Sequence, residues 1–97
     1  MGSVMLKKYK LDNLDKLDNK LDSVVDEVVA EYFDATMKFG KFVSRHEGIA
    51  IVEEEFLEFR DAAMWPHKLK PEDDDAYTEA KKLAAMSIRY MIDVGHE

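Results

Sequence analysis

The sequence contains no cysteine, which excludes disulfide bonds and metal sites built on thiolates. Glycine occurs four times and proline twice, too seldom for a protein made of short strands and tight turns. No apolar run approaches the roughly 20 residues of a membrane-spanning helix. Acidic residues outnumber basic residues by 21 to 14, and the formal charge of −7 disfavours nucleic acid backbones. We therefore expect neither nucleic acid nor a membrane as a partner.

The amino-terminal residues suggest where the folded part begins. The stretch "MGSVM" at 1–5 is typical of an expression scar ahead of a native start at Met5. The lysines that follow, Lys7, Lys8 and Lys10, do not precede an apolar stretch, so no signal peptide is indicated. We expect residues 6–97 to form one domain, because 97 residues are few for two. The lack of cysteine and of a signal peptide together predict a cytoplasmic protein.

Apolar residues recur with helical spacing in three segments. In 11–43 they repeat every seven residues, which predicts an amphipathic helix weakened by Gly40 near its end. A second helix is expected from Ser44 to about Met64, because "SRHE" matches a capping box and Pro66 follows closely. Pro71 is a suitable first residue for a third helix, which extends to Val94. The seven-residue repeat of the first helix consists of Leu14, Leu21, Val28, Ala35 and Phe42.

The third helix is apolar around most of its circumference in "LAAMSIRYMIDV" (83–94). Small residues at Ala80, Ala84 and Ala85 allow another helix to approach closely. One short chain has few elements with which to cover such a helix, and this favours a partner subunit. The predicted fold is all-α: a three-helix chain that forms an oligomeric helical bundle, as a homodimer or a dimer of dimers.

Acidic residues gather on the second helix in "EEEFLEF" (53–59). Residues three or four apart share a helix face, so Glu54 lies beside Glu58, and Glu55 lies three residues from Glu58. If the third helix packs antiparallel, Glu79 faces this group. Converging carboxylates select hard divalent cations, with Mg²⁺ the first candidate and Mn²⁺ the second. The alternative is an ordinary acidic face in contact with solvent.

Two stretches, "HEGIAIVEEEFLEF" and "EAKKLAAMSIRYMIDV", resemble the all-α nucleoside triphosphate pyrophosphohydrolases, the MazG-like superfamily. The family pattern is E-E-x-x-E on one helix and E-x-x-D on the next helix. Glu54, Glu55 and Glu58 match the first motif, and Glu79 matches the start of the second. Lys82 stands where the family has aspartate. The resemblance spans roughly residues 46–94, about half of the chain.

The resemblance implies Mg²⁺-dependent hydrolysis of a nucleoside triphosphate to the monophosphate and pyrophosphate. It implies catalytic roles for Glu54 and Glu55 and a metal-binding set made up of Glu54, Glu55, Glu58 and Glu79. Three consequences of Lys82 remain open: a metal site altered by a substitute ligand, a lysine that holds a phosphate, or lost activity. The candidate substitute ligands are Asp61, Asp75 and Asp93.

Four further residues have candidate roles beside the acids. The loop after the acidic helix offers Trp65 for stacking on a base and Lys68 for attracting phosphates. Arg89 is expected either to contact the triphosphate or to pair with Asp93. His46 fits a surface or capping position, since neither H-E-x-x-H nor E-x-x-H is present. A different function also fits the sequence: a non-enzymatic helical module for self-association, with the acids as surface.

Overall fold

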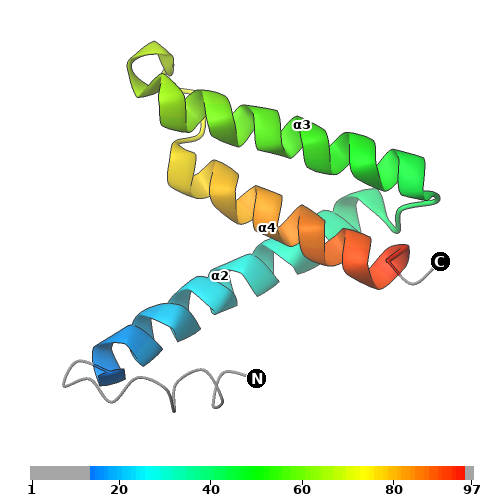
Figure 1. Ribbon diagram of the computed structural model, residues 1–97, viewed down its shortest axis with the longest axis horizontal. Coiled ribbons are helices and arrows are strands. Elements are labelled where there is room, and N and C mark those ends of the chain that lie inside the picture. The colour runs from blue at the N-terminus through cyan, green and yellow to red at the C-terminus, as the bar shows by residue number, and fades with distance from the viewer. Residues whose placement is uncertain (1–13, 96–97) are drawn as a thin grey trace.

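The computed structural model describes residues 14–95, with side chains from Asp18 onward. This part consists of helices α2 (Leu14–Phe39), α3 (Arg45–Met64) and α4 (Ala76–Asp93), with a short 3₁₀ helix η1 (Pro66–Lys68), as Figure 1 shows. The described range contains no strand, so the all-α class and the three helices are confirmed. The predicted scar at 1–5 and the first residues of the predicted first helix, 11–13, lie outside the described residues.

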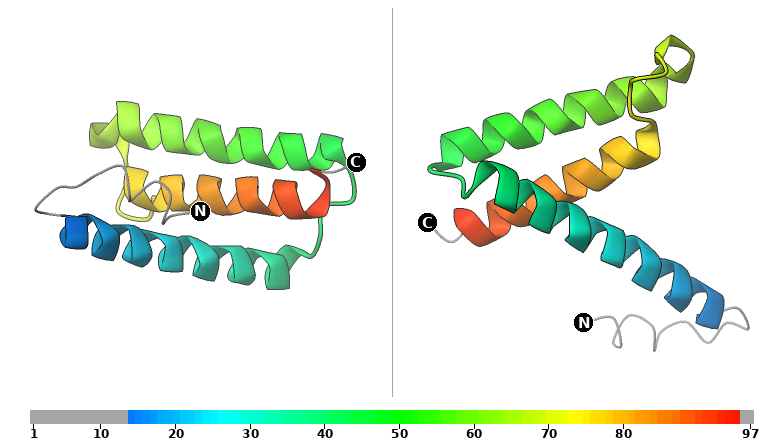
Figure 2. Two further views of the ribbon diagram at one scale, coloured as in Figure 1. Left: turned by 60° about the horizontal axis from the view of Figure 1, so that its bottom comes forward. Right: turned by 180° about the vertical axis from the view of Figure 1, so that it is seen from behind.

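Helix α4 lies between α2 and α3 (Figures 1 and 2). It packs on both of them and runs antiparallel to α3, the arrangement under which Glu79 was expected to face the acids of α3, and in the same general direction as α2. The hydroxyl of Tyr77, at the start of α4, donates to Glu27 Oε2 on α2 over 2.7 Å. The first half of α2 extends away from the other two helices (Figure 1).

Gly40 ends α2 three residues earlier than the apolar repeat predicted. Its φ of +72° lies in the left-handed region, where glycine has no Cβ to clash with the backbone. The Gly40 amide still donates to the Thr36 carbonyl at 2.9 Å, which completes the last turn. Phe42, the last member of the repeat, therefore lies in the connection between helices, yet its side chain is buried.

The predicted capping box at the start of α3 is present in a shifted form. The Glu47 amide donates to Ser44 Oγ at 3.1 Å, as expected. The Glu47 side chain accepts from the amide of Val43, one residue before the cap, at 3.0 Å. Two amides at the helix entrance are thus satisfied by side chains. The helix ends at Met64, as predicted.

Helix α4 begins at Ala76, five residues later than predicted from Pro71. Asp75 is its cap, because its side chain accepts from the Thr78 amide at 2.9 Å. This hydrogen bond lowers the pKa of the Asp75 carboxyl below its ordinary value. The Lys70 amide donates to Asp73 Oδ2 at 2.9 Å and holds the preceding residues in a turn. The acids before Asp75 are therefore outside the helix.

The core lies where the second half of α2 and the first half of α3 meet the second half of α4. Gly48 allows close contact there, because a Cβ at this position would lie 2.7 Å from Cδ2 of Tyr90. Among the members of the seven-residue repeat whose side chains are described, Ala35 and Phe42 are buried and Leu21 is 42% exposed. On α3 the apolar residues Ile49 and Phe56 are also exposed. The main core cluster comprises Ala35, Phe42, Ala85, Met86 and Val94.

No helix among the described residues has the length and apolar character needed to cross a membrane.

Candidate metal centre and adjoining groove

Three glutamates from two helices converge between α3 and α4. Glu55 and Glu58 lie three residues apart on α3, and Glu79 lies opposite them on the antiparallel α4. Each offers a carboxylate oxygen, and these oxygens all lie within 4.8 Å of one another. We call this group the glutamate cluster. Such a spacing allows several carboxylates to contact one small cation.

The glutamate cluster is shielded from water on one side. Glu79 is only 7% exposed, Glu55 is partly buried, and Glu58 is exposed. Glu55 Oε2 and Glu79 Oε2 are both buried, and neither has a hydrogen-bond partner within the described part of the chain. Burial of a carboxylate oxygen without a hydrogen-bond donor destabilises the folded state. Binding of a proton or a cation at these two oxygens would offset that cost.

The same surroundings change the acidity of the cluster. Burial, followed by the charges of Glu58 and Glu79, raises the pKa of Glu55 from 4.5 to about 7. Burial is also the main cause of a raised pKa at Glu79, which the nearby Lys82 partly opposes. Near neutral pH the cluster therefore holds its negative charge against an electrostatic penalty. A divalent cation would remove that penalty.

The positive charge of Lys82 acts on Glu55 and Glu79, but its ammonium forms an ion pair with a residue outside the cluster. Its ammonium donates to Asp74 Oδ2. This hydrogen bond is the main reason why the pKa of Lys82 is raised. Asp74 was missed because the sequence placed it inside α4, whereas it precedes the cap and folds back over Lys82.

Glu54 does not belong to the cluster, although it is next to Glu55 in the sequence. Its side chain is exposed and faces a groove beside the cluster. The three aspartates suggested as substitute ligands also lie elsewhere. Asp61 pairs with Arg60, Asp75 caps α4, and Asp93 accepts from the Phe42 amide at 2.9 Å.

The groove has a volume of about 700 Å³ and is formed by all three helices. Its α4 side includes Lys82 and Arg89, and its α3 side includes Glu54 and Glu55. This volume lies within the usual range for small-molecule sites. The groove therefore connects the glutamate cluster with basic side chains. The contribution of α2 was missed by the sequence analysis, although spacings of three and four place these residues on one helix face: Glu31, Asp34, Ala35 and Lys38.

Arg89 is the most deeply buried basic side chain in the described range, at 3% exposure. Its guanidinium donates to the Gly40 carbonyl and to the Met86 sulfur, the latter at 3.2 Å, and lies 4.3 Å from the centre of the Phe42 ring. Its Nε is buried without a partner among the described residues. The predicted pair with Asp93 is wrong, because Arg89 binds the connection after α2 and Asp93 binds the Phe42 amide.

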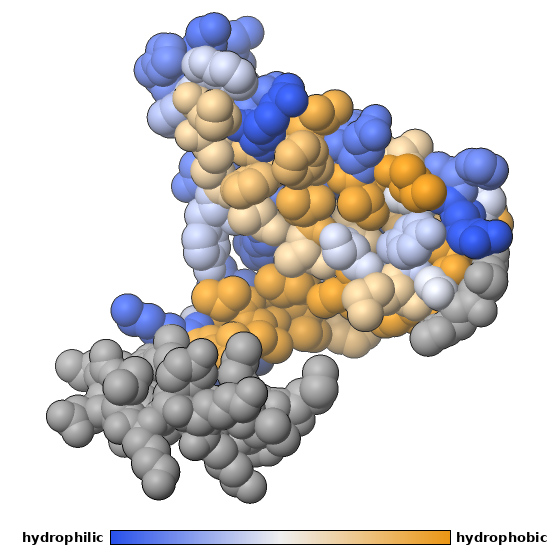
Figure 3. Space-filling view, viewed as in Figure 1, coloured by the Kyte–Doolittle hydropathy of each residue, from blue (hydrophilic) through white to orange (hydrophobic). Residues whose placement is uncertain are grey.

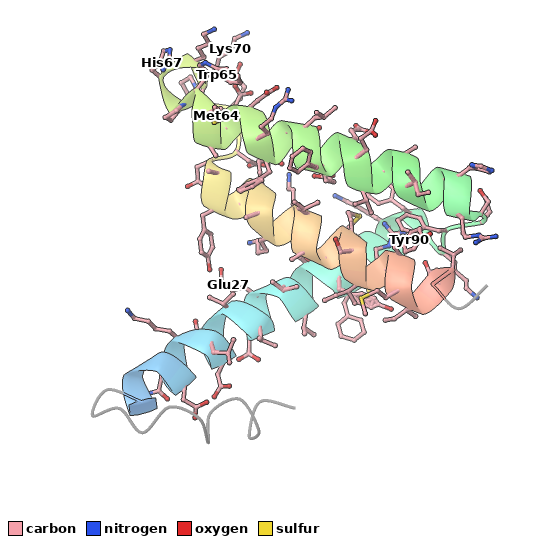
Figure 4. The ribbon with its side chains drawn as sticks, viewed as in Figure 1. Glu27, Met64, Trp65, His67, Lys70 and Tyr90 are labelled. Atoms are coloured by element: carbon pink, nitrogen blue, oxygen red, sulfur yellow. The ribbon has the colours of Figure 1, made fainter. Side chains whose placement is uncertain are left out.

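Trp65 and Lys68 are not among the residues that line the groove. They lie at the outer end of α3, where Figure 4 shows Trp65 with His67 and Lys70. Lys68 Nζ is 5.8 Å from the centre of the Trp65 ring, so the two contact each other. Tyr90 marks the opposite end of the α3–α4 pair in the same view. His46 is exposed in the first turn of α3, as expected.

Comparison of the chain with protein-family models, with curated proteins and with solved structures found no match.

Proposed function

We propose that this chain is a divalent-metal-dependent hydrolase of nucleoside triphosphates, which releases pyrophosphate and the monophosphate. The observation that carries the proposal is the glutamate cluster, with its two buried and unpartnered carboxylate oxygens. The resemblance of the two glutamate motifs to the MazG-like pyrophosphohydrolases supports the choice of reaction. The adjoining groove, with Lys82 and Arg89 in its lining, supports the choice of an anionic substrate.

The residues of the cluster fit a hard cation. Their ligand atoms are all carboxylate oxygens, and two of them lack any other partner in the described structure. Mg²⁺ is bound in proteins by few carboxylates and completes its six ligands with water and substrate phosphates. Glu55, Glu58 and Glu79 are the proposed ligands, and Mn²⁺ suits the same set. When bound, the ion supplies positive charge that offsets the phosphates and favours ionisation of water.

Glu54 is the proposed general base. It lies next to a proposed ligand, lines the groove and remains outside the glutamate cluster, so its carboxylate is free to accept a proton. The proton comes from the water that attacks the α-phosphorus. The bond from the α-phosphorus to the bridging oxygen then breaks, and pyrophosphate leaves. Glu55, which follows Glu54 in the chain and belongs to the glutamate cluster, shares the catalytic assignment.

Lys82 and Arg89 are the proposed groups that orient the phosphates. Lys82 lines the groove and lies close enough to Glu79 and Glu55 to affect their acidity. Its ammonium can donate to a phosphate oxygen next to the cluster. Arg89 is held rigidly by Gly40 and Phe42, so it adds fixed positive charge to the lining of the groove.

The test is pyrophosphate release from a panel of ordinary and modified nucleoside triphosphates, with Mg²⁺ and with a chelator. We expect release that requires Mg²⁺ and is lost in Glu79→Gln. The matched control is Glu53→Gln, on an exposed glutamate of α3 outside both the cluster and the groove lining. Absence of release with every triphosphate tested, in a protein that still binds Mg²⁺, would contradict the proposed reaction.

The second candidate is a helical interaction module that has lost the activity. Lys82 favours it, because a protonated lysine stands where the related family has a metal-binding aspartate and cannot bind a cation itself. The two candidates differ in their response to metal. A Mg²⁺ titration raises the melting temperature of a protein with a specific site, whereas a solvated acidic face gives no saturable rise.

A further inference from the structure

A second hollow lies between α3 and α4, and it differs from the groove beside the glutamate cluster in its charge. It has a volume of about 470 Å³ and a mainly apolar lining. Among the described residues that line it, Glu53 alone is charged. Apolar side chains also gather over α3 and α4 on the face that Figure 3 shows. An acid in apolar surroundings repels phosphates, so a nucleotide belongs in the groove, whose lining includes basic side chains.

The groove has two ends, which lie at different distances from the glutamate cluster. Its α4 wall carries Lys82, Met86 and Arg89, which share one helix face at spacings of four and three residues. Lys82 and Arg89 are seven residues apart, about 10 Å along the helix axis. Because α3 runs antiparallel to α4, Glu55 lies toward the Lys82 end and Ile51 toward the Arg89 end. The Lys82 end therefore adjoins the glutamate cluster, and the Arg89 end lies away from it.

The Arg89 end of the groove is lined by apolar and aromatic side chains. Phe39, which is 74% exposed, directly precedes Gly40, whose carbonyl accepts from the Arg89 guanidinium. Phe42 lies next to the same guanidinium, 4.3 Å from it at the ring centre. We call this part of the groove the aromatic end; it consists of Phe39, Phe42, Ile51, Met86 and Arg89. An exposed aromatic ring beside a hollow is a surface on which the flat ring of a base can stack.

Arg89 brings a buried positive charge to the aromatic end, and no carboxylate in the described range offsets it. The residue is 3% exposed, and none of the ion pairs among the described residues includes it. Two of its N–H groups are used, by the Gly40 carbonyl and by the Met86 sulfur. A guanidinium has further N–H donors, and the Nε of Arg89 has no partner within the described structure. A buried guanidinium with unused donors favours a ligand that offers hydrogen-bond acceptors.

The separation of Arg89 from the glutamate cluster decides which part of a nucleotide it meets. Glu79 and Arg89 are ten residues apart on α4, about 15 Å along the helix axis. The contacts with Gly40 and Phe42 hold the guanidinium at the aromatic end, away from the cluster. When the phosphates lie at the cluster, the groove leads the sugar and the base toward the aromatic end. Arg89 then acts on the phosphates through its charge alone, and its unused N–H groups meet the base.

We propose that the aromatic end binds the base of the substrate and that Arg89 selects bases with a carbonyl group on the edge that faces it. This inference rests on the proposed function, because it takes the phosphates to lie at the glutamate cluster. A carbonyl oxygen accepts from the guanidinium, whereas an amino group presents its own N–H groups to it. Guanine, hypoxanthine and uracil carry a carbonyl at the ring position where adenine and cytosine carry an amino group. The preferred substrates are therefore triphosphates of the oxo bases.

Matched pairs of nucleotides test this selection by pyrophosphate release with Mg²⁺. We expect kcat/KM to be roughly tenfold higher for inosine than for adenosine triphosphate, and for uridine than for cytidine triphosphate. Arg89→Lys keeps the charge but loses the planar fork of donors, so it should lower both ratios. The matched control is Arg60→Lys, at an exposed arginine of α3 outside the groove lining. Equal kcat/KM values within both pairs in the wild type would overturn the inference and leave the proposed reaction standing.

Binding of nucleoside monophosphates tests the aromatic end without turnover. By calorimetry with Mg²⁺ present, inosine monophosphate should bind roughly tenfold more tightly than adenosine monophosphate. Phe39→Ala should weaken both to a similar extent, because stacking does not depend on the carbonyl. Phe39 is exposed, so this variant tests the site even if circular dichroism shows that Arg89→Lys is unfolded.

The two experiments separate the base site from the reaction. Tighter binding of inosine monophosphate, without pyrophosphate release from any triphosphate, would refute the proposed reaction and support the base site. Equal affinities for the two monophosphates, or no binding of either, would overturn the inference.

Discussion

At the scale of single residues, the glutamate cluster carries negative charge that no cation offsets in the described structure. Three carboxylates share a small space, and two of them have a buried oxygen without a partner. Each member therefore weakens the fold when no cation is present. Removal of one charge should relieve this strain, and binding of a cation should do so to a greater extent.

Glu58→Gln should stabilise the metal-free protein and abolish its stabilisation by Mg²⁺. Removing one like charge is worth about 0.5 kcal/mol, which corresponds to a rise of roughly 2–4 °C in melting temperature. The wild type should gain about 2.7 kcal/mol at a Mg²⁺ concentration a hundredfold above Kd. Thermal melts with and without Mg²⁺ provide the measurement, with Glu53→Gln as control. A full Mg²⁺ effect in Glu58→Gln would remove Glu58 from the site.

Lys82→Asp should strengthen Mg²⁺ binding, because it replaces a nearby positive charge with a fourth carboxylate. The same change should lower the stability of the metal-free protein, since the ion pair with Asp74 is lost and the repulsion grows. Calorimetry measures the affinity for Mg²⁺, and Lys81→Asp, at the preceding residue, is the matched control. If nucleotide binding falls while metal affinity rises, Lys82 holds a phosphate. Unchanged affinity for both would place Lys82 outside the site.

The metal-free protein should lose stability as pH rises from about 5 to 8. The folded-state pKa of Glu55 is about 7, against an ordinary value of 4.5, and that of Glu79 is also raised. Between these values the folded state binds more protons than the unfolded state, so the free energy of unfolding falls with increasing pH. Urea unfolding in the presence of a chelator measures this slope. If the unfolding free energy of the wild type and of Glu55→Gln depends on pH in the same way, the raised pKa does not belong to Glu55.

At the scale of helices, two local devices determine where α3 starts and how closely it approaches α4. The Ser44 cap begins the helix, and Gly48 in its first turn allows Tyr90 and Phe42 to pack against its backbone. A glycine inside a helix normally costs about 1 kcal/mol relative to alanine. Here the lost propensity is offset by the close packing of α3 on α4.

Gly48→Ala should therefore destabilise the protein, contrary to helix propensity. A new Cβ would lie 2.7 Å from the Tyr90 ring and 3.2 Å from the Phe42 ring, and neither contact is with the free end of a flexible chain. The expected loss is about 1–3 kcal/mol by overpacking. Chemical unfolding gives the value, and Ser23→Ala at an exposed site on α2 is the control. A more stable Gly48→Ala would show that α3 can shift at little cost.

At the scale of the whole molecule, α4 packs on both α2 and α3, while apolar side chains such as Phe33 and Met37 on α2 are exposed among the described residues. The sequence analysis expected a partner on the third helix because of its apolar content, and on α4 the side chains of Met91 and Ile92 are exposed. Ala85 is fully buried between the helices of one chain.

If the chain is a dimer, its stability should depend on its concentration. Mass action predicts a melting temperature that rises as the protein is concentrated, because dissociation accompanies unfolding. Melts over a wide range of protein concentrations provide the measurement. A constant melting temperature in the wild type would indicate that each chain unfolds independently.

Local chemistry explains which features could be predicted. The helical class, the Ser44 cap and the end of α3 follow from spacing, hydrogen-bonding side chains and proline, all of which act over a few residues. The start of α4 could not be read reliably, because both Pro71 and Asp75 can begin a helix. The Thr78 amide binds the Asp75 side chain, and this decides between them.

The amino-acid sequence by itself determined that Glu55 and Glu58 lie on one helix face, because their separation of three residues matches the helical repeat. Tertiary structure decided the rest of the site. The packing of α4 on α3 brings Glu79 to this pair and leaves Glu54 in the groove, and the turn before Asp75 brings Asp74 to Lys82. These outcomes depend on rotation and sliding between helices, which the periodicity of one helix does not contain.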